Sequence, residues 1–527
     1  MRQPQVQPLL ENRLDVHDRK QFELKLEYQP SGTDHESQYA IDAYFFVPAQ
    51  LNVTQDTWTR EDFYADLHNY VRLKTPTLSF DEILTEAVSP LVQLEQQLAR
   101  PALSSQSEVV YDAKMLSCVF RGALRRFSRG MNEQCTALAA GKDPIDCAPP
   151  SSLEELERLA RSSVVATREV LTRYRAVSAA LTTKFEATPK TRASLRLVDE
   201  YMSLTVEQFF RKTVVEMDQM PRTGVFAELR KELMNQVVAD EGYRKDHQLR
   251  SVISPTGDNE EYTHRIGFLK KFCMNILFLR VARTQTRQAW EEVVLALAAG
   301  LAMAFATGVA FFTQTQVTQA SFNVFLILVV GYMFKDRIKE GARRIFTHYA
   351  RKTLFDRSTK IIDTVTQELV GVCKEKVDYS GFEVPADVAR LRNQDDFVTV
   401  SQGEMSESVI RYQKKIVLES DMLPRLGDGI VTGVTDIIRI DIDRLLRDMD
   451  DPEFALEYID LEDFSVGKVK AAKSYQVDMA FRFAVDDGPT KRTEVQLVRL
   501  VIDRNGIKRM LKLKGGEGLV APLVPVR

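Results

Sequence analysis

The side chains that could carry out catalysis or hold a metal are dispersed along the 527 residues of this sequence. None of the six histidines is followed by a second one four residues later, so the spacing of helical zinc ligands is missing. Asp15, His17 and Asp18 come nearest to a metal-ligand cluster. Two carboxylates and one imidazole at this spacing are typical of a solvated segment, and we expect neither a metal nor another cofactor.

Two glycine-containing segments match nucleotide-binding loops only in part. A phosphate-binding loop needs a glycine five residues before Gly141, where this chain has Thr136, and Asp143 follows Lys142 where the loop needs Ser or Thr. A second set of glycines is spaced one residue too widely for a dinucleotide fingerprint: Gly427, Gly429 and Gly433. Neither segment therefore predicts a nucleotide site.

Charged clusters are equally unspecific. Counted from Asp448 as a calcium loop, the acidic stretch has Glu453 at the glycine position and Ile459 in place of the bidentate glutamate. Arginines recur every fourth residue at Arg121, Arg125 and Arg129, a spacing that suits a solvated or salt-bridged helix face. No combination of residues identifies a catalytic centre, so the sequence gives no positive sign of an enzyme.

The overall composition excludes several classes of protein. Lys and Arg number 71 and Asp and Glu 74, a formal net charge of −3, and 44% of the residues are hydrophobic. These values exclude a collagen-like chain, a highly charged disordered chain, a many-span transporter and a generally basic nucleic-acid binder. The first twenty residues lack the apolar stretch of a secretory signal, and the five cysteines are dispersed, which predicts reduced thiols in the cytosol.

One segment dominates the interpretation, because no charged residue or histidine occurs from Val293 to Phe334. Its first part, Val293 to Phe312, is a continuous apolar run that would extend about 30 Å as a helix, the thickness of a bilayer core. The second part, taken from Val317 to Phe334, would just be long enough to cross. We therefore predict a transmembrane helical hairpin over 291–334. A buried hairpin in a soluble bundle and a re-entrant second run are the alternatives.

Two sets of residues predict what this hairpin would contact. Small residues every fourth position in the first run predict a face for close helix packing against the second run or another subunit: Ala296, Gly300, Ala304 and Gly308. Cations follow the second run and suit the anionic inner leaflet: Lys335, Arg337, Lys339, Arg343 and Arg344. Since cations flank both ends and the turn has none, the positive-inside rule predicts an integral membrane protein with both termini cytoplasmic, in the inner or plasma membrane if bacterial.

Patterns outside the hairpin predict the remaining regions. Alternating apolar residues at 22–28 and 41–47 favour an N-terminal β-hairpin within region 1–80. Helical periodicity predicts a bundle over 81–290, with its clearest helix from Ser151 or Ser152 to about Phe185, and a cationic helix over 335–380. Alternation from Tyr475 to Val485, a second strand to Ile502 and a turn at Asn505-Gly506 predict an α+β domain over 381–527 with an antiparallel meander.

These expectations combine into a fold class and a function. The chain is expected to be a mostly α membrane protein, with a two-helix transmembrane hairpin between a cytoplasmic helical bundle and a C-terminal α+β domain. The leading hypothesis is a membrane-anchored scaffold whose partners are the lipid bilayer, anionic lipids, other proteins and a second copy of itself, but not nucleic acid. An oligomeric channel gated by the cytoplasmic domains, and a membrane-anchored enzyme with a site built from distant residues, are the alternatives.

Overall fold

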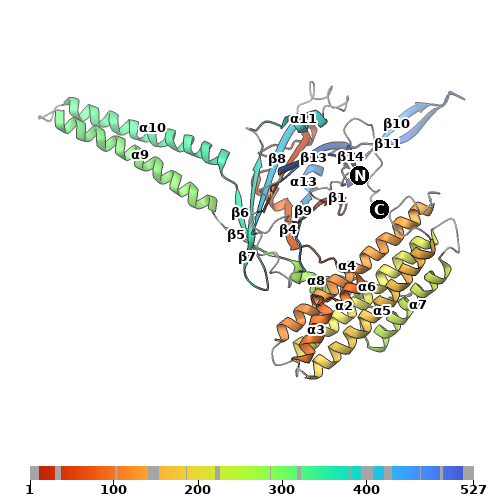
Figure 1. Ribbon diagram of the computed structural model, residues 1–527. Helices are drawn as coiled ribbons and strands as arrows, with labels where there is room; N and C mark the ends of the chain where they lie inside the picture. Colours follow the sequence, from red (N-terminus) through yellow and green to blue (C-terminus); the bar gives the residue numbers. More distant parts are fainter. Residues whose placement is uncertain are drawn as a thin grey trace, which may run out of the picture.

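The computed structural model describes residues 11–29, 37–100, 105–139, 153–184, 187–219, 226–284, 286–316, 322–379, 382–392, 407–419, 430–462, 464–486 and 491–513. Two antiparallel sheets form the middle of the molecule. A group of long helices lies to one side of the sheets, and a helical hairpin projects from them in another direction (Figure 1). The architecture is therefore mixed α and β, with long helices at its periphery.

The larger sheet has eight strands in the order β14-β13-β12-β3-β8-β7-β6-β5. Their bounds are β3 Ser37–Pro48, β5 Arg280–Thr284, β6 Arg357–Ile362, β7 Leu369–Asp378, β8 Glu407–Leu418, β12 Tyr475–Asp486, β13 Lys491–Asp503 and β14 Gly506–Leu513. β3 lies at a central position, between β12 and β8, and most of its residues are buried there. An N-terminal strand thus joins segments that follow it by about four hundred residues.

The smaller sheet has the order β1-β2-β9-β4, with β1 Glu11–Val16, β2 Gln21–Tyr28, β4 Leu67–Leu73 and β9 Val434–Asp441. The expected N-terminal β-hairpin is wrong, because its two strands, β2 and β3, lie in different sheets. β2 pairs with β1 and β9, whereas β3 pairs with β8 and β12. Alternation of apolar residues fixes which face of a strand is buried but not its pairing partner. The division of the chain into five regions stays a prediction.

Short helices lie between the longer elements, and their starts follow from the local sequence. Thr59 and Ser79 each accept a hydrogen bond from the third residue of the helix that follows, and the side chains of Asp62 and Glu82 bond back to complete capping boxes. These short elements are α1 Arg60–Asp66, α2 Phe80–Thr85, α3 Pro90–Ala99, α11 Ala386–Arg392, α13 Asp443–Leu446 and the 3-10 turns Ala49–Leu51 and Asn275–Leu277.

The long helices beside the sheets form a bundle that shares one continuous apolar core with them. The helices are α4 Gln106–Ala139, α5 Leu153–Lys184, α6 Pro189–Asp218, α7 Ala227–Asp246 and α8 Glu260–Met274. The clearest helix expected from the sequence is present as α5. The helical bundle expected to extend to residue 290 is wrong at its end, because α8 ends at Met274 and β5 then joins the edge of the larger sheet.

The projecting hairpin consists of α9 Thr286–Gln316 and α10 Phe322–Thr353. Among the described residues, only Glu292–Thr313 of α9 is long and apolar enough to cross a membrane. In α10 the helix begins at Phe322, so its apolar run ends at Lys335 after 13 residues. The prediction of two membrane spans, and of a mostly α two-pass membrane protein, is therefore wrong. The second run reaches spanning length only if it begins at Val317, and residues 317–321 lie outside the described residues.

Two further expectations concern the chain after the hairpin. The cationic helix expected over 335–380 is wrong in its extent, because α10 ends at Thr353 and the strands β6 and β7 follow. The C-terminal meander is present as β12, β13 and β14. A register irregularity of the meander lies between Val501 and Ile502, in the pairing of β13 with β14. A separate two-stranded sheet, β10 Glu453–Ile459 with β11 Val466–Ala472, extends from the body (Figure 1).

Candidate functional site

The α9–α10 hairpin is held at one edge of the larger sheet. β5 leads into α9 and α10 leads into β6, and these two strands pair antiparallel from Arg280–Ile362 to Thr284–Ser358. Both ends of the hairpin are thereby fixed side by side, and the two helices extend together away from the sheet (Figure 1). Because strand pairing holds both ends of the hairpin, the hairpin has a defined position on the rest of the fold.

Small side chains join the two helices. Ala298, Ala302 and Thr313 of α9 are buried, although most of the residues around them are exposed. On α10, a Cβ atom added to Gly331 would lie 3.0 Å from Cγ1 of Val309, so the helices approach closely there. Close approach through small residues is the ordinary way in which apolar helices pack together.

The predicted packing stripe lies on a different face of α9 from this contact. Its members Ala296, Gly300, Ala304 and Gly308 are all exposed. A Cβ atom added at Gly300 or Gly308 meets nothing within 4 Å. The stripe therefore does not pack against α10 within one chain. Packing of these residues against a second copy stays a prediction.

Large apolar side chains cover the outside of the hairpin. Phe311 is 69% exposed and Phe322 is 76% exposed, and both lie near the end of the hairpin that is farthest from the sheet. Comparable exposure extends along both helices, at Leu297, Leu301, Met303, Phe312, Phe325, Leu326, Met333 and Phe334. Water-exposed surfaces of folded proteins rarely carry an apolar patch of this extent without a binding role.

The predicted basic residues begin where the apolar run of α10 ends. Arg337, Lys339, Arg343 and Arg344 are exposed, while the half-buried Lys335 extends its ammonium over the ring of Tyr332, 4.4 Å from its centroid. Arg344 also lies 3.6 Å from Glu340 on the next helical turn. The structure thus brings the five cations together on one segment, directly beside the apolar surface.

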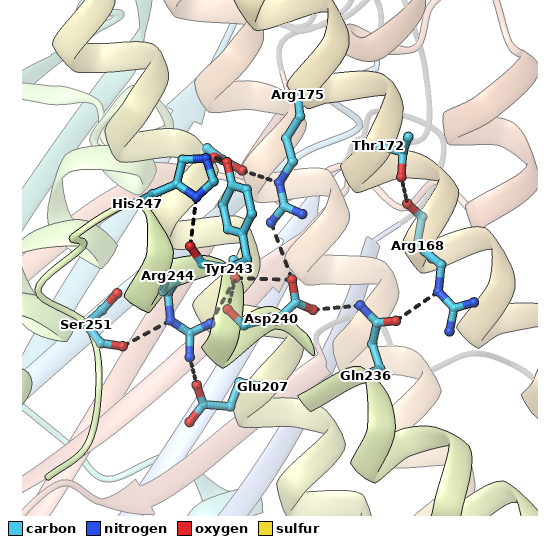
Figure 2. Close-up of polar contacts among 12 residues, drawn as sticks. Arg168, Thr172, Arg175, Glu207, Gln236, Asp240, Tyr243, Arg244, His247 and Ser251 are labelled. Atoms are coloured by element: carbon cyan, nitrogen blue, oxygen red, sulfur yellow. Dashed lines mark hydrogen bonds and ion pairs between the residues drawn. The ribbon is translucent and has the colours of Figure 1, made fainter. Parts of the chain in front are cut away.

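A second group of residues that the sequence analysis missed lies inside the bundle. Arg244 of α7 is fully buried and pairs with Glu207 of α6. Its guanidinium also donates to Ser203 Oγ at 2.8 Å and to the carbonyl oxygen of Ser251 at 3.0 Å (Figure 2). Burial lowers the pKa of Arg244 to about 10. The arginine remains charged at neutral pH and ties α6, α7 and the following loop together.

The same polar network extends to α5. Asp240 accepts hydrogen bonds from Arg175 at 3.3 Å and from Gln236 at 2.8 Å, and Gln236 accepts one from Arg168 at 3.0 Å (Figure 2). The guanidinium of Arg175 also lies 3.5 Å from the ring centroid of Tyr243. Burial raises the pKa of Asp240. Most of these groups bond to one another, so the network acts as an internal tie between helices.

The other residues considered from the sequence do not converge on a site. Asp15, His17 and Asp18 are exposed, and no group of three or more potential metal ligands occurs among the described residues. The acidic stretch lies at the surface, where Asp450 pairs with Lys473 and Asp451 with Arg504. Gly141, Lys142, Gly427 and Gly429 fall outside the described residues.

Comparison with known proteins finds no matching family model, no similar curated protein and no similar solved structure. The function therefore has to be argued from the chain itself. With a single candidate span among the described residues, the two-pass scaffold and the channel built on two spans are both wrong.

Proposed function

We propose that this protein attaches to a lipid bilayer from one side, by inserting the outer part of the α9–α10 hairpin without crossing. The observation that carries the proposal is the outward apolar surface on both helices of a hairpin whose ends are fixed by strand pairing. Only 11% of the apolar segment of α9 is buried, which is unlike the core helix of a globular domain. A bilayer is a solvent that accommodates such a surface.

The length of α10 limits the depth of insertion. Its apolar part, Phe322 to Phe334, rises about 20 Å as a helix, whereas the hydrocarbon core is about 30 Å thick. Insertion beyond this depth would carry Lys335 and the cations after it into hydrocarbon, which is strongly unfavourable. The hairpin therefore enters the core and stops with its basic residues among the lipid headgroups, where anionic lipids attract them.

One-sided attachment leaves the rest of the described chain in one aqueous compartment. The sheets and the bundle share a continuous core, and the hairpin projects from the edge of the larger sheet, away from the bundle (Figure 1). The body would then be presented at the membrane surface for contact with other proteins. The expected protein partners and self-association stay predictions.

Flotation with phospholipid vesicles tests the attachment. The full chain should float with vesicles of phosphatidylcholine and phosphatidylserine, and a cysteine placed by Phe312→Cys should become inaccessible to an aqueous maleimide once the vesicles are bound. The matched control is Leu461→Cys, an exposed apolar position on the loop after β10, which should stay reactive.

Depth is tested by sealing the same maleimide inside the vesicles. Protection of the Phe312→Cys thiol from the trapped reagent agrees with insertion that stops short of crossing. Labelling from the lumen would contradict one-sided attachment, and a chain that stays at the bottom of the gradient would contradict attachment altogether.

A further inference from the structure

A polar cavity of about 180 Å³ lies between the two sheets. Strand β4 of the smaller sheet supplies one wall and strands β5 to β8 of the larger sheet supply the other, with Asn69, Val281, Arg357, Ile361, Glu375 and Lys414 among the lining residues. The interior between two packed sheets is normally filled by apolar side chains. A cavity with several charged groups at this position therefore needs an explanation.

A row of charges crosses the wall formed by the larger sheet. Arg357 on β6 pairs in register with Glu375 on β7, and Glu375 pairs with Lys414 on β8. The ammonium of Lys414 is fully buried and lies 2.7 Å from the carboxylate of Asp436, which belongs to the smaller sheet. Burial lowers the pKa of Lys414, but the charges of Asp436 and Glu375 outweigh this effect and raise it. The Lys414–Asp436 pair thus joins the two sheets behind the cavity.

Glu375 is held in a fixed position by two donors. Its carboxylate accepts a hydrogen bond from the hydroxyl of Tyr412 at 2.6 Å and another from the side-chain amide of Asn69. The carboxylate is therefore oriented by groups from both sheets. Such fixed polar groups are typical of a preorganised binding site.

One group on the lining, the guanidinium of Arg357, has hydrogen-bonding capacity that no described residue uses. The amide oxygen of Asn69 also has no partner, but it is buried and not open to the cavity. The guanidinium of Arg357 lies 3.8 Å from the ring centroid of Tyr64 and forms no hydrogen bond or ion pair with a described residue, although Glu375 is directly opposite. Guanidinium groups bind carboxylates through paired hydrogen bonds, and a carboxylate such as that of Glu375 accepts from an amino or hydroxyl group.

We propose that this cavity binds a small carboxylic acid that also carries an amino or hydroxyl group, such as a free amino acid. Its carboxylate would pair with Arg357, its N–H or O–H group would donate to Glu375, and its carbon chain would contact Val281. The positive charges of Arg357 and Lys414 balance the negative charges of Glu375 and Asp436. A lining without net charge favours a zwitterion over a strongly charged ligand. The site does not depend on membrane attachment, although β5 and β6 carry the hairpin.

Calorimetric titration of the full chain in detergent, with each of the twenty free amino acids and with lactate as probes, tests the proposal. At least one probe should bind with a Kd of about 1 mM or tighter. Arg357→Met keeps an apolar stem over Tyr64 and should weaken that binding about tenfold or more, because the charge-assisted pair is lost. Lys360→Met is the control, since Lys360 lies on the same strand with its side chain exposed, and it should bind as the unchanged chain does.

A second variant checks the position of the ligand. Val281→Trp at the edge strand should fill the cavity and abolish binding while the thermal unfolding midpoint is retained. The proposal is overturned if none of the probes binds, or if binding survives both Arg357→Met and Val281→Trp. Membrane flotation of these variants should be unchanged, so the outcome is separate from that of the attachment experiment.

Discussion

The bundle and the hairpin are built from helices of similar length, but the bundle buries its apolar side chains whereas the hairpin exposes them. α5 and α9 have 32 and 31 residues, respectively. α5 buries apolar side chains such as Leu171 and Tyr174 against its neighbours, whereas α9 leaves Leu301 and Phe311 exposed. The bundle also buries a charged residue, Arg244, which has no equivalent among the described residues of the hairpin. The length of a helix therefore does not indicate whether its apolar side chains are buried. The contacts made by each face of the helix determine that.

The comparison teaches that the two regions obtain their order from different sources. In the bundle, each apolar side chain removed from water contributes about 1.5–3 kcal/mol, and the polar network fixes which helix faces meet. In the hairpin, only a narrow seam of small residues is removed from water, and strand pairing at its base holds the helices together. The hairpin's large side chains remain available for a partner.

The largest effect is expected from the charge buried in the bundle. Arg244→Met should lower the free energy of unfolding by about 3 kcal/mol, because the buried carboxylate of Glu207 loses one of its two cationic partners and keeps only Arg211. Urea denaturation followed by circular dichroism measures the loss. Arg250→Met removes an exposed pair with Glu261 and should change the free energy of unfolding by less than about 1 kcal/mol. Equal losses of unfolding free energy in the two variants would show that the buried ion pair contributes no more than the exposed one.

The second largest effect is expected in thiol reactivity, which should be much lower in the bundle than on the hairpin. Burial raises the pKa of Cys118 to about 12 and of Cys135 to about 11, and both lie on α4 in the bundle. The thiolate fraction of Cys135 at pH 8 is then about two hundredfold below that of an ordinary cysteine. Iodoacetamide should modify a cysteine placed at Phe312 at the ordinary rate in the absence of lipid. Modification of Cys118 or Cys135 at the same rate would mean that the bundle opens freely.

A charge placed on the hairpin should affect membrane binding and leave folding unchanged. Phe325→Lys introduces an ammonium into the segment expected to enter hydrocarbon, at a cost of about 2.5–3.5 kcal/mol, or about one hundredfold in vesicle affinity. Quantitative flotation measures the change. Leu461→Lys, at an exposed apolar position outside the hairpin, should float normally. Unchanged binding of the Phe325→Lys variant would remove the hairpin from the attachment surface.

The smallest effect is expected from the basic residues after the apolar run. Arg337→Gln should weaken binding to phosphatidylserine-containing vesicles about fivefold, the consequence of losing about 1 kcal/mol of attraction to anionic lipid. Binding to neutral phosphatidylcholine vesicles should not change. Added salt should reduce the difference between the two chains, since it screens exposed charges. An equal effect on both vesicle types would contradict a headgroup position for this residue.

Much of the local structure was predictable from the sequence, because it follows from side-chain periodicity. The helix α5 and the C-terminal strands β12 and β13 fall where their patterns place them. The number of membrane spans was not predictable in the same way, since it depended on where the second apolar helix begins. That helix begins at Phe322, which leaves its apolar part too short to cross.

The candidate sites were likewise only partly predictable from the sequence. The apolar hairpin and its cations were visible in the sequence as a contiguous segment, and the structure adds which faces are exposed. The cavity between the sheets was not visible, because Asn69, Arg357, Glu375 and Lys414 come from distant parts of the chain. Arg244 also gave no signal, since an arginine in a charged helical segment looks the same whether it is buried or solvated.

The sequence by itself determined the charge-free stretch of the hairpin, the cations after it and the periodicities of the main helices and strands, because these depend on neighbours along the chain. The tertiary structure alone decided that β3 lies between strands from the other end of the chain and that Lys414 meets Asp436 across two sheets. Strand partners and buried ion pairs depend on shape and solvation in the whole folded chain. No local pattern of residue types encodes that choice.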